Sequence, residues 1–205
     1  LLDGTFTWTP RPTISLAAPE RAEDAFAAGQ LVEELQRCLG FGADIGPADD
    51  PAVLVGLLSD PAVAARLAGE DLSPLQGREP ESYALLVRPD GITAAGSGPA
   101  GTFYAIQTLK QLIRANRRRN AIPCLRVLDW PGLRYRGYSD DISRGPIPTM
   151  EFFKRQIRTM AEFKMNMLTF YTEHVFKLNK HPIIAPPDGI TADQVRELDA
   201  YARQH

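Results

Sequence analysis

Two segments of the sequence indicate how the chain folds: Leu-Arg-Tyr-Arg-Gly-Tyr-Ser-Asp-Asp-Ile at 133–142 and Asn-Met-Leu-Thr-Phe-Tyr at 166–171. Both are short and lie between turn residues, a pattern typical of strands. The helical pattern of 151–164 follows Thr149, a residue type that favours helix N-termini. A helical connection of this length joins parallel strands. Since Thr191 caps a further predicted helix over 192–204, the strand–helix order is repeated and indicates an α/β fold.

The N-terminal half is predicted to be a small α+β layer. Alternation and apolar spacing predict strands and helices, broken by turn residues such as Pro-Asp-Gly at 89–91 and by Gly40. We expect Asp60 to be the N-cap of a short helix that has proline at its first position. The predicted order is strand 5–9, helix 23–39, strand 52–58, helix 62–67, hairpin 82–87 with 92–95, helix 99–115 and strand 124–130.

Composition and charge exclude several classes of protein. The 205 residues carry 23 Lys and Arg against 25 Asp and Glu, a formal net charge of −2. We therefore expect neither a nucleic-acid nor a membrane partner, because non-specific affinity for both comes from clustered positive charge. No apolar run is long enough to span a bilayer. The start, Leu1 to Gly4, lacks a Met and a signal pattern, so we expect a trimmed or mature segment.

The cysteines and histidines predict neither a disulfide framework nor a metal site. Cys38 and Cys124 are 86 positions apart and have no nearby cysteine, so we expect two unpaired buried thiols. The histidines lack metal-ligand spacing, and we expect no cofactor; they are His174, His181 and His205.

Two further motifs have ordinary structural interpretations. Residues 96–101 fit G-x-G-x-x-G, but the preceding strand belongs to a hairpin and Pro99 removes one amide donor, so we expect a tight strand-to-helix turn. Arg117-Arg118-Arg119 lies at a helix C-terminus without interleaved aromatic residues, a pattern typical of solvated charges.

Acidic residues end the two strands quoted above. Asp140 and Asp141 are adjacent and must point to opposite faces of the sheet, so they cannot form a facing acid–base pair. Glu173 and His174 follow the second strand. Side chains at the carboxyl ends of parallel strands line ligand crevices, which makes these positions candidate site residues.

Three segments resemble glycoside hydrolase family 20, the β-N-acetylhexosaminidases. Residues 100–113 are similar to the helix A-G-x-x-Y-G-x-Q-T-L-x-Q-L that ends the small N-terminal domain of this family. Residues 136–144 are similar to the R-G-x-x-x-D-x-x-R segment that enters the barrel, and residues 190–202 to a later helix. The usual second-strand H-W-H-L-x-D-D is absent, and the sequence 171–174 is closer to a branch with Y-T-E-D, where His174 replaces the aspartate.

The resemblance implies an N-terminal α+β domain over 1–128 and the first βα units of a (β/α)8 barrel over 129–205. A complete barrel needs roughly 250 residues, and the family's catalytic Asp-Glu pair lies on the fourth barrel strand. We therefore expect no catalytic residue in this chain and no activity from it alone. The longer protein would remove terminal N-acetylhexosamine by a substrate-assisted, retaining mechanism. The expected sugar-binding residues are Arg136, Asp141, Glu173 and His174.

Other interpretations stay open from sequence alone. The chain could belong to a glycosidase of another substrate class, such as the α-glucuronidases, or be a non-catalytic carbohydrate-binding module. Nucleotide binding at 96–101 is a third hypothesis, which Gly98→Val would test by loss of NAD(P) binding. A carbohydrate with a terminal amino sugar is the expected partner, and a homo-oligomer is compatible with the sequence.

Overall fold

The computed structural model describes residues 1–78 and 80–205. The chain forms two compact units, Leu1–Gly132 and Leu133–His205, each of which is described by itself. Within the described residues, every helix is too short or too polar to cross a bilayer.

A six-stranded sheet is the centre of the first unit. Its order is β3-β2-β4-β6-β5-β8. The first four strands in this order, β3, β2, β4 and β6, are parallel to one another. β5 is antiparallel to both of its neighbours, β6 and β8. A separate antiparallel pair joins β1 (Thr5–Thr7) to β7 (Ala121–Pro123). The bounds of the six strands are β2 Thr13–Leu16, β3 Asp44–Ile45, β4 Val53–Leu57, β5 Tyr83–Arg88, β6 Gly91–Gly96 and β8 Leu125–Asp129.

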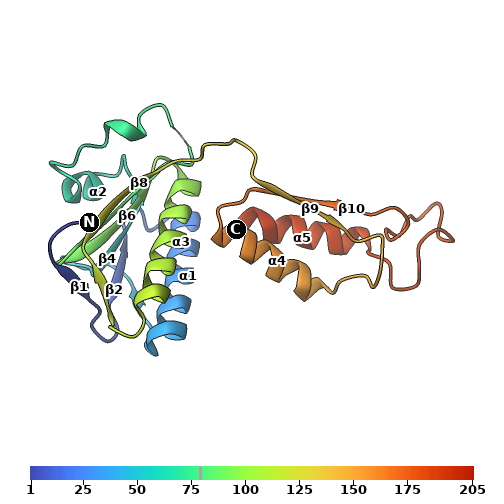
Figure 1. Cartoon of the computed structure of the whole chain (residues 1–205), viewed down its shortest axis with the longest axis horizontal. Coiled ribbons are helices and arrows are strands. Elements are labelled where there is room, and N and C mark those ends of the chain that lie inside the picture. Colours follow the sequence, from blue (N-terminus) through green and yellow to red (C-terminus); the bar gives the residue numbers. More distant parts are fainter. Residues whose placement is uncertain (79) are drawn as a thin grey trace. The chain divides into compact units, whose positions relative to one another are not determined.

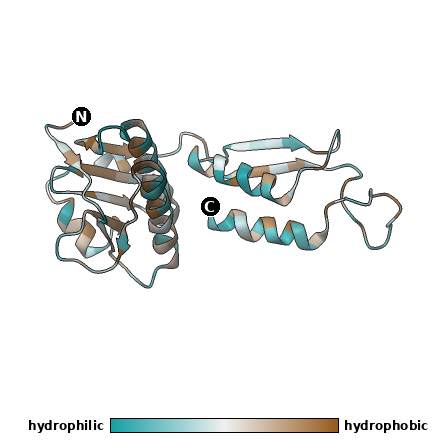
Figure 2. Ribbon diagram, turned by 90° about the horizontal axis from the view of Figure 1, so that it is seen from below, coloured by the Kyte–Doolittle hydropathy of each residue, from teal (hydrophilic) through white to brown (hydrophobic). Residues whose placement is uncertain are grey.

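Helices cover both faces of this sheet. On one face α1 (Ala22–Leu39) packs on α3 (Pro99–Asn116), and on the other lie α2 (Pro61–Arg66) and the 3-10 helix η1 (Ser73–Leu75) (Figure 1). Side chains alternate between the two faces along a strand. Since helices cover both faces, the side chains of the central strands pack against helices whichever way they point. The sheet is accordingly hydrophobic along most of its strands (Figure 2).

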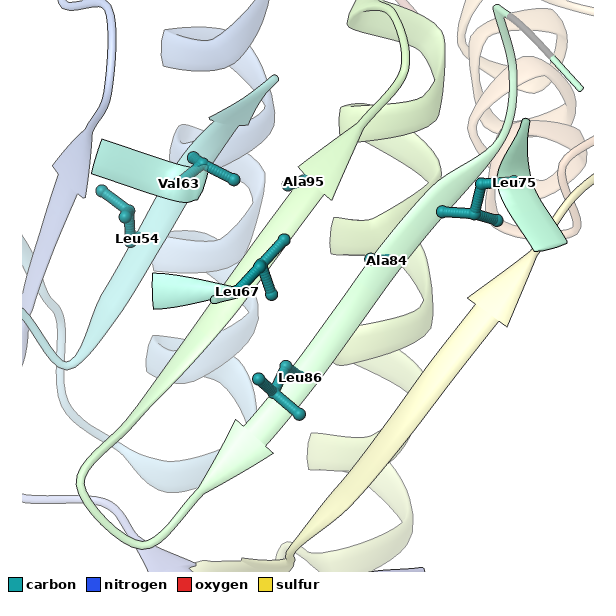
Figure 3. Packing of buried hydrophobic residues seen from close by; sticks show 7 residues of the cluster. All are labelled: Leu54, Val63, Leu67, Leu75, Ala84, Leu86 and Ala95. Atoms are coloured by element: carbon teal, nitrogen blue, oxygen red, sulfur yellow. The ribbon is translucent and has the colours of Figure 1, made fainter. Parts of the chain in front are cut away.

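Figure 3 shows the apolar cluster on the α2 face of the sheet. Leu54 of β4 and Leu86 of β5 point toward this face, where α2 and η1 cover them. The neighbouring Val53 and Val55 are fully buried on the opposite side of the same strand. The cluster comprises Leu54, Val63, Leu67, Leu75, Ala84, Leu86 and Ala95.

The second unit repeats the strand–helix order. β9 (Gly137–Asp141) pairs in parallel with β10 (Met167–Tyr171), and α4 (Met150–Glu162) connects them. Thr191 caps α5 (Ala192–Gln204): its hydroxyl accepts the Gln194 N–H, while the Gln194 side chain accepts the Thr191 N–H. The apolar core lies between the helices and one face of the two strands, with Phe153, Ile157 and Leu198 buried in it.

The structure confirms the α/β class and refines several predicted elements. The hairpin forms β5 and β6, and α5 has the predicted bounds. The predicted strand 133–142 is shorter in the structure: β9 spans Gly137–Asp141, so residues 133–136 lie outside it. Asp60 occupies the N-cap position of α2, but its carboxylate makes no cap hydrogen bond; it accepts from the Arg21 guanidinium and the Leu57 N–H. Both cysteines are free, and of the two only Cys124 is buried.

Candidate functional site

The carboxyl ends of β9 and β10 lie side by side in the second unit. The strands are parallel, and their register pairs Asp141, the last residue of β9, with Tyr171, the last residue of β10. In folds built from parallel βα units, side chains at this edge form the ligand-facing surface. The side chains gathered here are therefore the first candidates for a site.

Asp141 is held as a carboxylate. Its Oδ1 accepts hydrogen bonds from the Ser143 hydroxyl and from the Ser143 N–H, the latter over 3.0 Å. These two bonds lower the pKa of Asp141 below its usual range, and the Arg144 guanidinium, with Nε 3.8 Å from Oδ2, acts in the same direction. An exposed carboxylate that stays ionised at neutral pH suits the acceptance of sugar hydroxyl protons better than general acid catalysis.

Glu173 extends this group from the other strand. The Tyr171 hydroxyl donates to Glu173 Oε1 over 2.8 Å, a bond that raises the pKa of Tyr171. Arg144 Nη2 lies 3.8 Å from the same Oε1. The four side chains form what we call the carboxyl-edge cluster: Asp141, Arg144, Tyr171 and Glu173.

Arg144 is the exposed cation of this cluster. Its side chain is 78% exposed and lies between carboxylates that come from successive strand ends. Neither ion pair is tight, so the guanidinium donors remain accessible to a ligand. A guanidinium beside two carboxylates offers both donors and acceptors to a polyhydroxylated molecule.

Arg136 lies at the opposite end of β9 from the cluster. Its Nε donates to the Lys164 carbonyl over 2.6 Å and its Nη1 to the Leu133 carbonyl over 2.8 Å. Its backbone N–H donates to Asn166 Oδ1. About 13 Å of strand separates this end from Asp141. The structure therefore brings Asp141 and Glu173 together and leaves Arg136 apart.

The other candidate residues, His174 and Asp140, differ in exposure and in the side of the strand to which they point. His174 is exposed next to Glu173 and makes no hydrogen bond or ion pair within the described part of the chain. Asp140 accepts from Gln156 Nε2 of α4 over 2.9 Å, so it points to the helix side, as the alternation of β9 requires. Arg144 is the last residue of the segment matched at 136–144 but was not among the expected sugar-binding residues, and Tyr171 was not selected from sequence. The available signal was their position at the same strand ends as Asp141 and Glu173.

The glycine-rich segment 96–101 is a close-packed turn. A Cβ on Gly101 would lie 2.2 Å from the Ser82 carbonyl oxygen, and one on Gly96 would lie 2.1 Å from the Thr102 amide nitrogen. The Thr102 hydroxyl donates to the Gly56 carbonyl over 2.9 Å. These contacts occupy the space around the loop, and they give the glycines a packing reason, as the sequence predicted.

Among the described residues, no group of three or more His, Cys, Asp and Glu side chains could hold a metal ion.

Comparison with known proteins identifies the class. Residues 1–130 match the family described as glycosyl hydrolase family 20, domain 2. Because this match covers more than half of the 205 residues, the chain belongs to glycosyl hydrolase family 20.

Individual relatives agree with this assignment. A β-hexosaminidase of Vibrio vulnificus is 36% identical over 90 residues, which are 44% of this chain and 10% of the relative. A β-hexosaminidase of Porphyromonas gingivalis is 29% identical over 146 residues, covering 60% of this chain and 19% of the relative. The chain thus spans between about a tenth and a fifth of the curated relatives it matches.

Solved structures share the fold. A mutant β-hexosaminidase of Streptomyces plicatus in complex with its product GlcNAc has a TM-score of 0.77 at 19% identity, covering 98% of this chain and 41% of that one. An exo-β-N-acetylglucosaminidase of Vibrio harveyi, in complex with N-acetylglucosamine, has a TM-score of 0.73 at 19% identity, covering 99% and 33%. These likenesses confirm the α/β architecture.

Proposed function

We propose that this chain is part of a glycosidase that removes terminal N-acetylhexosamine, and that the carboxyl-edge cluster contacts the sugar. The observation that carries the proposal is the meeting of Asp141, Arg144 and Glu173 at the carboxyl ends of two parallel strands in a family 20 chain. The complexes of two structural neighbours with N-acetylglucosamine support the choice of sugar.

The two units have different roles in this proposal. Residues 1–128 form the non-catalytic α+β domain, and residues 129–205 contribute the first two βα units of the catalytic barrel. The parallel pair β9–β10 with its connecting helix has the local architecture that such a barrel repeats. General acid catalysis then depends on residues outside this chain, which supplies sugar contacts.

Hydrolysis of a chromogenic N-acetyl-β-glucosaminide tests the activity. We expect turnover by the longest reading frame that contains this sequence and none by the 205-residue chain. Turnover by the 205-residue chain itself would contradict the assignment of catalysis to other residues. Inactivity of both would favour another sugar or a binding module.

Single substitutions in the longer protein test the sugar contacts. Arg144→Ala should raise KM roughly 30-fold, the loss expected for a charge-assisted hydrogen bond of about 2 kcal/mol. Arg155→Ala removes another exposed arginine, on α4, and should leave KM unchanged. An unchanged KM for Arg144→Ala would remove the cluster from the sugar site.

Arg136 and His174 are expected to affect sugar binding in different ways. Arg136 holds the start of β9 to the Lys164 carbonyl, so Arg136→Ala should raise KM only together with a loss of thermal stability. His174 is exposed beside Glu173, so His174→Gln should change KM without changing stability. Measuring Tm and KM for both variants separates a positioning residue from a contact residue.

A further inference from the structure

The end of α3 carries an unneutralised group of arginines. α3 ends at Asn116, and residues 114–119 line a hollow of about 510 Å³. Arg117, Arg118 and Arg119 are all exposed, and none of their side chains makes an ion pair or hydrogen bond to any residue that the structure describes. Three adjacent guanidinium groups are thus free to bind an anion.

The neighbouring end of α1 adds to this positive charge. Arg114 donates from Nε to Glu34 Oε1 over 2.8 Å and from Nη2 to Oε2, and Arg37 donates to Oε1 over 2.6 Å. Although burial opposes it, the hydrogen bonds from these two arginines hold the pKa of Glu34 at about 2. A single carboxylate therefore serves two arginines, and the ends of α1 and α3 keep an excess of positive charge in a chain of net charge −2.

The helix dipole accounts for part of this charge. A cation in the last turn of a helix interacts favourably with the C-terminal carbonyl groups, and Arg114 occupies that position. Arg117, Arg118 and Arg119 follow the helix in sequence. A guanidinium group can donate two parallel hydrogen bonds to a pair of oxygens on a carboxylate or a sulfate. The hollow also falls within the range of small-molecule sites, about 300–1,000 Å³.

We propose that Arg117, Arg118 and Arg119 bind an anionic glycan, an oligosaccharide that carries carboxylate or sulfate groups. The choice of a glycan rests on the proposed function, since a glycosidase works among sugar polymers and a second contact on its non-catalytic unit would keep it on such a polymer. Residues 114–119 include no aromatic side chain on which a base could stack, which disfavours single-stranded nucleic acid.

Calorimetric titration of the 205-residue chain with tetragalacturonate tests the proposal. We expect saturable binding that weakens as sodium chloride is raised, because the contacts are ionic. Replacing Arg117, Arg118 and Arg119 together by glutamine should lower the affinity roughly tenfold or more. A charge-matched control replaces Arg134, Arg155 and Lys180, three exposed cations of the second unit, by glutamine and should bind like the parent chain.

Each outcome decides the proposal. Equal binding by the parent and the triple arginine variant would overturn it, as would equal losses in both triple variants. Neutral chitotetraose binding as tightly as tetragalacturonate would show that charge is not recognised. A single-stranded oligonucleotide that binds as tightly as the glycan would assign the site to another polymer. The readout is independent of the hydrolysis assay, so failure here leaves the proposed activity standing and the reverse also holds.

Discussion

Asp24 is a buried carboxylate whose two oxygens differ. Its Oδ2 accepts from Arg21 over 2.6 Å, while Oδ1 is buried and has no hydrogen-bond partner among residues 1–78 and 80–205. Burial raises the pKa of Asp24, although the bond from Arg21 opposes the shift. The same guanidinium donates twice to Asp60, and this interaction lowers the pKa of Asp60. One arginine therefore holds two carboxylates with opposite pH behaviour.

Asp24→Asn should stabilise the protein more as pH rises. A raised pKa means that the folded state binds the proton more tightly than the unfolded state, whose Asp pKa is about 3.9. The contribution of Asp24 is therefore complete below that value and is lost as pH rises toward the folded pKa. Urea unfolding of parent and variant between about pH 4 and about pH 7 should show a difference that moves in favour of the variant.

Asp60→Asn is the matched comparison with the opposite slope. The lowered pKa of Asp60 contributes stability above the unfolded pKa, and this contribution is lost as pH falls. The variant should lose about 2 kcal/mol at neutral pH, since hydrogen bonds to a charged group are weakened. The difference in unfolding free energy between the parent and this variant should become smaller as the pH is lowered. If the change in unfolding free energy varied with pH in the same direction for both variants, this account would be contradicted.

The paired helices α1 and α3 each contain a glycine, and only one of these glycines is required by packing. A Cβ on Gly101 of α3 would meet the Ser82 backbone, whereas a Cβ on Gly29 of α1 would meet nothing within 4 Å. Gly101→Ala should therefore destabilise the protein by about 1–3 kcal/mol through overpacking. Gly29→Ala should stabilise it by about 0.5–1 kcal/mol, because alanine favours helix. Chemical denaturation measures both changes, and a Gly101→Ala variant as stable as the parent would contradict the close-packed turn.

Elements with strong local signals could be predicted from the sequence, and elements formed by distant pairing could not. The capping residue Thr191 and the Pro-Asp-Gly turn act over a few neighbours, so α5 and the β5–β6 hairpin were predictable. β2 is only four residues long and occupies the sheet through pairing with β3 and β4. No local pattern encodes that pairing. Asp60 is the N-cap residue of α2, as predicted, but the sequence did not show that its carboxylate accepts from Arg21, 39 positions away, and makes no hydrogen bond to the helix.

At the scale of the whole molecule, the sequence predicted which strand ends meet, but not which side chains contact one another near the candidate site. Parallel order alone places Asp141 and Glu173 at one end of β9 and β10, and this followed from the strand–helix–strand pattern. The partners of Arg136 did not follow, because they depend on how Lys164 and Leu133 approach it in space. The interior of a site is set by such tertiary contacts, which one sequence without its fold does not reveal.

The two units should differ in their ability to fold alone. The first has a six-stranded sheet with helices on both faces, whereas the second has a single pair of strands, and pairs of strands are marginal without further packing. In the second unit Met167, Tyr171, Phe163 and Ile183 are exposed, with Ile183 at 95%. Residues 1–132 expressed alone should therefore unfold in one cooperative thermal transition. Residues 133–205 alone should show no such transition and should bind a hydrophobic dye such as ANS. The 205-residue chain is the control, and a cooperative, dye-negative monomer of 133–205 would show that this unit needs no further strands.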